Sequence, residues 1–157
     1  RTLEIEAMTH WKGSLYLGLK APLDEAGRAM IWKLDDPDSF LRTGDIQDAQ
    51  LSLWGKLNLP AQLNGQDVPA GLSELLFLPN GSLLMTSTPS TGDGSAPTGF
   101  LSHASKPTGG LMSAVTVRAF QGLKPEGMSL SAKPGHIVIA FDKGSDLPDW
   151  TELPWPK

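Results

Sequence analysis

Three glutamates recur at similar places along this chain of 157 residues, and their carboxylates are its best candidates for chemistry. Glu6, Glu74 and Glu126 each open an apolar, strand-like segment, and a turn glycine follows seven to nine residues later. Carboxylates that converge repel one another unless a cation or hydrogen-bond donors relieve the charge. A calcium ion, which takes about six to eight oxygen ligands, would do so. The pattern therefore predicts either a calcium site or carboxylates that accept backbone N–H groups from a neighbouring element.

Asp142 is the fourth candidate carboxylate. It follows an apolar strand pattern in register with Lys20 and Thr88, which makes it a further candidate metal ligand. Its other interpretation is a turn cap, because Lys143-Gly144 comes directly after it and Asp commonly caps such turns. The predicted metal set is thus Glu6, Glu74, Glu126 and Asp142, and the sequence assigns no catalytic residue.

Other kinds of site have less support. His10, His103 and His136 lack metal-ligand spacing, so we interpret them as independent surface or turn residues. The chain contains neither a Gly-x-Ser-x-Gly nucleophile motif nor a phosphate-binding loop. It also contains no cysteine, which excludes disulfides and thiolate chemistry.

Charge and hydropathy restrict the partners. The net charge is −4, and the thirteen Lys and Arg residues are scattered rather than gathered in a basic stripe. Nucleic acid is therefore not an expected partner. No apolar run has the length of a membrane span, so none is expected. With 17 Gly and 13 Pro, long helices would be interrupted, whereas short strands joined by turns are compatible with this composition.

The elements that must position the glutamates form a repeat. The three copies are residues 6–19, 74–87 and 126–141, and each has a Glu, a turn and a second apolar strand. Pro79-Asn80-Gly81 and Lys133-Pro134-Gly135 are hairpin signals. The glutamates lie 68 and then 52 residues apart, as expected for β-propeller blades of roughly 40 to 50 residues with variable loops.

Further strand patterns fill the intervals. Residues 28–34 and 50–54 complete the first unit, and residues 99–103 and 114–120 complete the second. The last of these alternates strictly, which predicts a half-buried strand with Val115 and Val117 on one face. Residues 89–97 and 105–110 are predicted to be surface loops, and residues 35–48 an acidic excursion with a helical turn. After the third hairpin we predict only a Pro-rich tail.

The predicted fold is therefore all-β, a β-propeller of about two and a half four-stranded blades. The blades comprise residues 1–68 and 69–121, the half blade residues 122–146 and the tail residues 147–157. Two and a half blades leave sheet edges open, whereas propellers close a ring of about four to eight blades. Because the strand pattern begins at once after Arg1, we interpret the chain as the C-terminal portion of a larger propeller. The partner is then the missing N-terminal blades or, alternatively, a second copy.

Two stretches carry a resemblance to a known family. They are Ile-Glu-Ala-Met (5–8) with Leu-Tyr-Leu-Gly-Leu-Lys-Ala-Pro (15–22), and Lys-Pro-Glu-Gly-Met (124–128) with Ile-Ala-Phe-Asp-Lys-Gly (139–144). They resemble uncharacterised bacterial β-propeller domains that are similar to esterase-like or phytase-like propellers. Related gluconolactonases and paraoxonases use a blade-opening Glu as a calcium ligand in the central channel. The resemblance therefore implies a calcium cofactor at Glu6, Glu74 and Glu126.

Two functional hypotheses follow. The first is a non-catalytic binding module of the cell envelope or extracellular space that binds a protein or small-molecule ligand across its face. The expected location of the protein is then extracellular or periplasmic. The second is a calcium-dependent hydrolase, an esterase, phosphoesterase or lactonase-like enzyme, acting in the channel. Trp11, Trp32 and Trp54 all fall in the first blade, where packing between blades is the simpler interpretation and a carbohydrate platform the sharper one.

Overall fold

The structure is a computed structural model that describes residues 2–89, 97–144 and 146–156. In these residues the chain is all-β, with one short helix, α1 (Pro37–Thr43), and one 3-10 turn, η1 (Asp48–Gln50). The strands are β1 (Glu4–Trp11), β2 (Ser14–Ala21), β3 (Ala29–Asp35), β4 (Leu51–Leu57), β5 (Gln62–Leu63), β6 (Gln66–Asp67), β7 (Leu72–Phe77), β8 (Leu83–Ser87), β9 (Pro97–Ala104), β10 (Gly110–Leu111), β11 (Val115–Gln121), β12 (Lys124–Leu130), β13 (His136–Asp142) and β14 (Asp149–Pro154). Within the described ranges, no helix is long and apolar enough to cross a membrane.

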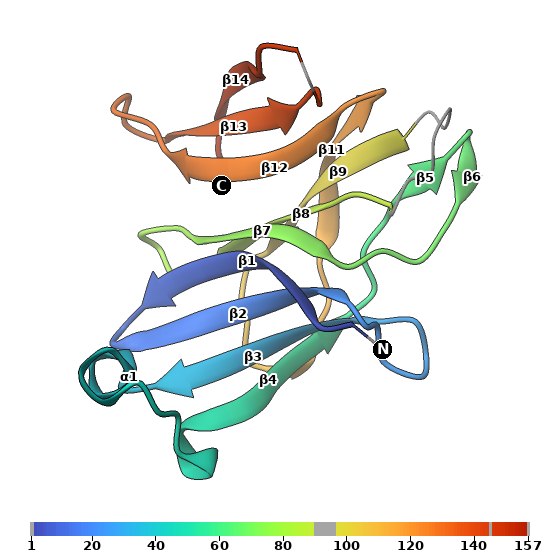
Figure 1. Cartoon of the computed structure of the whole chain (residues 1–157). Helices are drawn as coiled ribbons and strands as arrows, with labels where there is room; N and C mark the ends of the chain where they lie inside the picture. Colours follow the sequence, from blue (N-terminus) through green and yellow to red (C-terminus); the bar gives the residue numbers. More distant parts are fainter. Residues whose placement is uncertain (1, 90–96, 145, 157) are drawn as a thin grey trace.

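The described strands form three sheets, and none of them closes on itself. The first sheet runs β1-β2-β3-β4, with β10 added in parallel beyond β4. The second sheet runs β7-β8-β9, and β11 and the short β5 both pair with β9. The third sheet is β12-β13-β14. The sheets lie as successive layers, with β1, β7 and β12 near one another (Figure 1), and β7 contacts both β1 and β12.

The predicted hairpins are confirmed. Gly81 and Gly135 adopt φ of 85° and 74°, a backbone conformation that glycine reaches without steric cost. Asn80 Oδ1 accepts hydrogen bonds from the backbone N–H of Ser82 at 3.0 Å and from its hydroxyl at 2.7 Å, which fixes the turn between β7 and β8. The helical turn expected in the acidic excursion is α1, capped by Asp36 and by Gly44 at φ 76°.

The first hairpin of each sheet contains the same irregularity. A register shift directly precedes the pairs Ala7↔Gly18, Glu74↔Thr86 and Gly127↔Ala140. The residues left unpaired by the shifts are Glu6, Ser73 and Glu126. A β-bulge bends its strand and re-aims side chains, so these three positions are structurally equivalent.

Two apolar cores hold the layers together. The core between the first and second sheets includes Ile31, Leu72 and Met85, and the core between the second and third includes Leu84 and Ile139. Each of these side chains is at most 1% exposed. Burial of one such side chain stabilises the fold by about 2 kcal/mol, so the layers depend mainly on these contacts.

The tryptophans of the first sheet divide into two groups. Trp11 stacks on Phe77 of the second sheet with ring centroids 5.3 Å apart, and Trp54 meets the same ring edge-on at 6.2 Å. Packing between sheets therefore accounts for Trp11 and Trp54. Trp32 instead lies on the opposite face, which the second sheet does not cover.

Two predictions about strands were wrong. The tail contains β14, which pairs with β13 from Asp149 to Pro154, so the third unit has three strands rather than two. Its prolines stand at or beyond the strand ends, where a missing N–H does not break the ladder.

Val115 and Val117 were expected on a buried face but are 65% and 39% exposed. They lie on an outer strand with a register shift between Thr116 and Arg118, so alternation alone did not report burial. Of the loop predicted at residues 89–97, residues 90–96 lie outside the described part.

Candidate functional site

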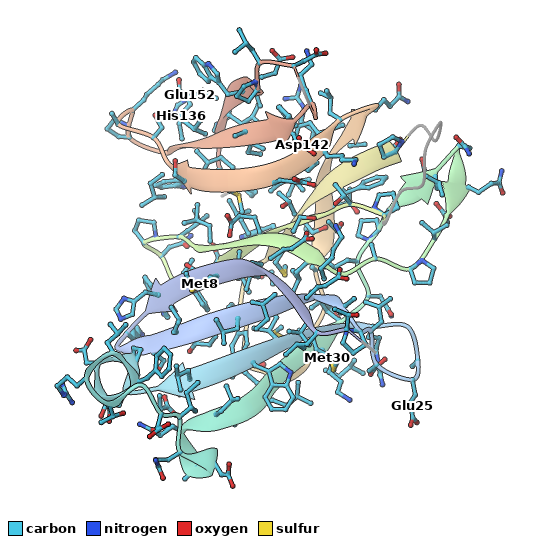
Figure 2. The ribbon with its side chains drawn as sticks, in the orientation of Figure 1. Met8, Glu25, Met30, His136, Asp142 and Glu152 are labelled. Carbon is cyan, nitrogen blue, oxygen red and sulfur yellow. The ribbon has the colours of Figure 1, made fainter. Side chains whose placement is uncertain are left out.

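The bulges gather polar side chains beside the first strands. Leu19, Ser87 and Phe141 belong to the pairs that precede the bulges, so the residues that follow them are equivalent to one another. These residues are Lys20, Thr88 and Asp142. The register predicted for Lys20, Thr88 and Asp142 is thus confirmed. Figure 2 shows Asp142 at the end of β13 and Met8 on β1.

The ammonium of Lys20 is the best-organised group of the site. Lys20 is 8% exposed, and its Nζ donates to Ser73 Oγ at 2.9 Å and to Thr88 Oγ1 at 2.6 Å. The two hydroxyls also lie 2.7 Å apart, so one donates to the other. Burial of an unpaired ammonium costs several kcal/mol, and these hydrogen bonds offset part of that cost.

The carboxylate nearest to Lys20 is that of Glu6. The distance from Lys20 Nζ to Glu6 Oε2 is 3.5 Å, and the Glu6 side chain is 42% exposed. This is longer than the roughly 2.7–2.9 Å of a charge-assisted hydrogen bond. Lys20 and Glu6 therefore form an ion pair without a short hydrogen bond, while the Lys20 ammonium donates its short bonds to the two hydroxyls.

A small hollow opens above this ammonium. Its volume is about 200 Å³, and its wall carries three carboxylates, two ammonium groups and a hydroxyl. The residues are Glu4, Glu6, Lys20, Thr88, Pro89, Lys124 and Glu126. We call this the axial pocket; its carboxylates come from β1 and β12, the first strands of the first and third sheets.

Glu126 has the most strongly opposed charge environment at the axial pocket. Burial, and then the carboxylate of Asp142, raise the pKa of its carboxyl above 4.5. The ammonium of Lys20 acts in the opposite direction, Glu6 raises the pKa further, and Lys124 lowers it. A cationic group entering the pocket would therefore relieve repulsion at Glu126.

Glu74 does not share this site, which corrects the predicted register of the three glutamates. Ser73 occupies the position equivalent to Glu6 and Glu126, and Glu74 comes one residue later. The Glu74 carboxylate accepts the backbone N–H of Leu75 at 2.8 Å, and the backbone N–H groups of Met8 on β1 and Met128 on β12 also act to lower its pKa. Burial raises the pKa of Glu74, whereas these N–H groups act in the opposite direction. For Glu74, the alternative of backbone donors from neighbouring elements is the one observed.

Asp142 acts as the predicted turn cap. Its Oδ1 accepts the backbone N–H of Gly144 at 2.7 Å. Over the described residues, no three His, Cys, Asp or Glu side chains are grouped as a metal site would require. The calcium site at Glu6, Glu74, Glu126 and Asp142 stays a prediction.

One of the three histidines differs from expectation. His103 is 6% exposed and its Nε2 has no hydrogen-bond partner in the described part of the chain, so it is not a surface residue. Burial lowers its pKa below 6.5. His136 Nδ1 lies 2.9 Å from the carbonyl oxygen of Pro134, within the turn between β12 and β13.

The sequence interpretation did not identify Lys20, Ser73 and Lys124 as site residues. One available signal was the charge of Lys20 within β2, a strand of otherwise apolar and small residues. In a half-buried strand, such a residue requires buried partners.

Comparisons with known proteins add nothing to this geometry. No family model, curated protein or solved structure matches the chain.

Proposed function

We propose that the chain is a ligand-binding β-propeller module whose three sheets are consecutive blades. Three features support this: the sequential order of the longer strands in each sheet (β1-β2-β3-β4, β7-β8-β9-β11 and β12-β13-β14), a bulge at the same place in each first strand, and contacts of β7 with both β1 and β12. The first strands then line the axis, as expected of propeller blades. The axial pocket is the binding site.

The ligand is a small molecule that carries both a cationic and an anionic group. The observation that carries this proposal is the Lys20 ammonium, which is fixed by two buried hydroxyls on the wall of a pocket that also contains carboxylates. An anionic group binds Lys20 and Lys124, and a cationic group binds Glu126 and Glu6. A volume of about 200 Å³ suits a ligand of amino-acid size.

Ligands that carry a single charge fit the axial pocket less well. A simple anion would meet three carboxylates at the wall, and a simple cation would meet an ammonium that cannot move away from its hydroxyl partners. A zwitterion presents an opposite charge to both sets of groups, and complementary charges give specificity.

The test is titration of the full chain with glycine, acetate and methylammonium, followed by amide chemical shifts in NMR spectra. We expect glycine to shift amides around Lys20, Thr88 and Glu126, and the two single-charge probes to shift them much less. Lys20→Met should abolish the response, because it removes the charge and keeps the length. Lys133→Met, in the exposed turn between β12 and β13, is the matched control. Equal responses to all three probes, or an unchanged response in Lys20→Met, would contradict the proposal.

A calcium-dependent hydrolase is the second candidate. The observation that favours it is the raised pKa of Glu126, whose carboxyl lies near two other carboxylates. A carboxyl with a raised pKa can serve as a general acid, and a bound metal cation would stabilise its ionised form. The response to calcium and chelator described in the Discussion tests this candidate.

A further inference from the structure

The first sheet has an uncovered apolar face on the side away from the second sheet. This face forms a shallow hollow of about 350 Å³ with an almost entirely apolar lining. It is lined by Leu3, Ile5, Leu17, Leu19, Pro22, Met30, Trp32 and Leu51. Leu3 and Ile5 are 63% and 48% exposed. A contiguous apolar face of this kind marks an interaction surface. We call it the leading face; Met30, labelled in Figure 2, belongs to it.

The third sheet has an uncovered face of a different kind. Ile137, Ile139 and Phe141 of β13 point into the core shared with the second sheet. Side chains alternate along a strand, so Val138 and Ala140 point the other way. Ala140 pairs with Gly127 on one side and with Trp150 on the other, and Trp150 is 68% exposed. This surface, which we call the trailing face, combines small residues on β12 and β13 with the ring of Trp150 at its edge, and Glu152, which pairs with Val138, lies beside that ring.

The contacts between the existing layers repeat at equivalent positions. A Cβ on Gly18 of the first sheet would lie 2.9 Å from Leu72 Cδ1 of the second, so these residues are in close contact. Thr86 of the second sheet donates its hydroxyl to the carbonyl oxygen of Pro125 of the third at 3.0 Å. In each interface, a residue of the second strand meets a residue of the first strand in the following sheet.

The strand register extends this series by one step. Gly18, Thr86 and Ala140 are equivalent, because each is in the first pair after the bulge. The residues in the pair before the bulge are also equivalent, and they are Ile5, Leu72 and Pro125. Gly18 meets Leu72 and Thr86 meets Pro125, so the next contact of the series is Ala140 with Ile5.

We propose that the trailing face of one copy packs on the leading face of a second copy, with Ala140 against Ile5. Because each copy carries both faces, two such contacts in a head-to-tail pair close six sheets into a ring. Six lies within the range of about four to eight blades that propellers use. The inference rests on the propeller arrangement proposed above, but it does not depend on the axial pocket.

A second copy fits the leading face because the trailing and leading faces differ in side-chain size, as do the packed faces of the first and second sheets. Small residues of the first sheet, Ala7 and Gly18, receive the large Leu72. The trailing face offers the small Gly127 and Ala140, and the leading face offers the large Ile5 and Leu17. Both components of such a contact are therefore present on one chain.

The experiment is the molar mass of the full chain in solution, measured by light scattering after size exclusion. We expect a dimer that dissociates on dilution. Ile5→Glu and Ala140→Lys should each weaken the dimer at least tenfold, because they place charges in an apolar contact while being exposed in a single copy. Mixing the two variants should restore association, since one interface then carries no substitution and the other pairs Glu with Lys. Leu41→Glu, at a side chain of α1 that is 77% exposed and away from both faces, is the control.

Several results would overturn the inference. A folded monomer at high concentration would do so, as would a dimer that Ile5→Glu disrupts and Ala140→Lys does not, because that result indicates leading faces packed on each other. Folding that requires further propeller blades from another chain would also exclude the second copy as the occupant. A dimer that does not respond to glycine would leave this inference intact and contradict only the proposed ligand.

Discussion

Glu74 is the residue whose change should affect the arrangement of the sheets most directly. Its carboxylate accepts the backbone N–H of Leu75, and the backbone N–H groups of Met8 and Met128, on the first strands of the other two sheets, also lower its pKa, so we expect it to join all three first strands. Glu74→Gln keeps the size of the side chain but removes the charge and replaces one acceptor oxygen with a donor NH₂. At least one backbone N–H then faces another donor.

The expected cost follows from the number of bonds. A hydrogen bond to a charged group contributes about 1.5–3 kcal/mol, and an unsatisfied buried donor costs about 1–3 kcal/mol. With one N–H left unpaired and the others bound to a neutral acceptor, Glu74→Gln should lower the free energy of unfolding by about 2–4 kcal/mol. Glu74→Ala, which leaves all three N–H groups without the carboxylate, should cost more.

Urea denaturation with amide hydrogen exchange measures this effect. The exchange of the Met8 and Met128 amides should accelerate in Glu74→Gln, because they lose a charged acceptor. Glu25→Gln, an exposed carboxylate in the loop after β2 (Figure 2), should leave both quantities unchanged. If Glu74→Gln were as stable as the Glu25 control, or if only the Leu75 amide responded, the carboxylate would not join the three strands.

Three other outcomes are expected. Burial lowers the pKa of His103 below 6.5, so the folded state binds a proton at this histidine less readily than the unfolded state. The free energy of unfolding should therefore be undiminished above pH 6.5 and should decline as the pH falls towards the lowered pKa, and His103→Phe should remove this part of the pH dependence of urea unfolding. Gly71→Ala should destabilise the fold by at least about 2 kcal/mol in thermal unfolding, because the new Cβ would lie 2.0 Å from the Lys20 carbonyl oxygen, and backbone gives way poorly. If calcium binds Glu6, Glu126 and Asp142, the melting temperature should rise with calcium and fall with chelator, and Glu126→Gln should abolish the response while the chain stays folded; no shift in either direction would contradict the calcium site and the hydrolase that depends on it.

The hairpins could be predicted because turn residues act locally: Asn80-Gly81 and Pro134-Gly135 specify their turns without help from distant residues. The predicted equivalence of Glu74 with Glu6 was wrong, because it was counted from the turn glycine. The first turn is two residues long, between the paired Trp11 and Ser14, whereas five residues separate the paired Phe77 and Leu83. The longer turn shifts the count, and Ser73 takes the bulge position.

Long-range partners explain what else the sequence did not reveal. The ammonium of Lys20 is matched by hydroxyls that lie 53 and 68 residues away in the chain. The exposure of Val115 and Val117 depends on the position of β11 at the outside of its sheet, which alternation does not encode. Such features depend on which elements pack together, and no local pattern specifies that.

The parallel pairing of β10 with β4 has a consequence for how the molecule opens. The segment between β9 and β11 leaves the second sheet, pairs with Gly55 and Lys56 on β4, and adds a hydrogen bond from the Met112 N–H to the Lys56 carbonyl oxygen at 2.9 Å. Main-chain hydrogen bonds therefore join the segment between β9 and β11 to the first sheet, whereas in the described residues no strand crosses to or from the third sheet in this way. Local unfolding should follow this division, with the first two sheets opening as one cooperative unit and β12–β14 opening separately at a lower free energy. In native-state exchange, the amides of β13 should then respond to low denaturant before those of β3 and β8.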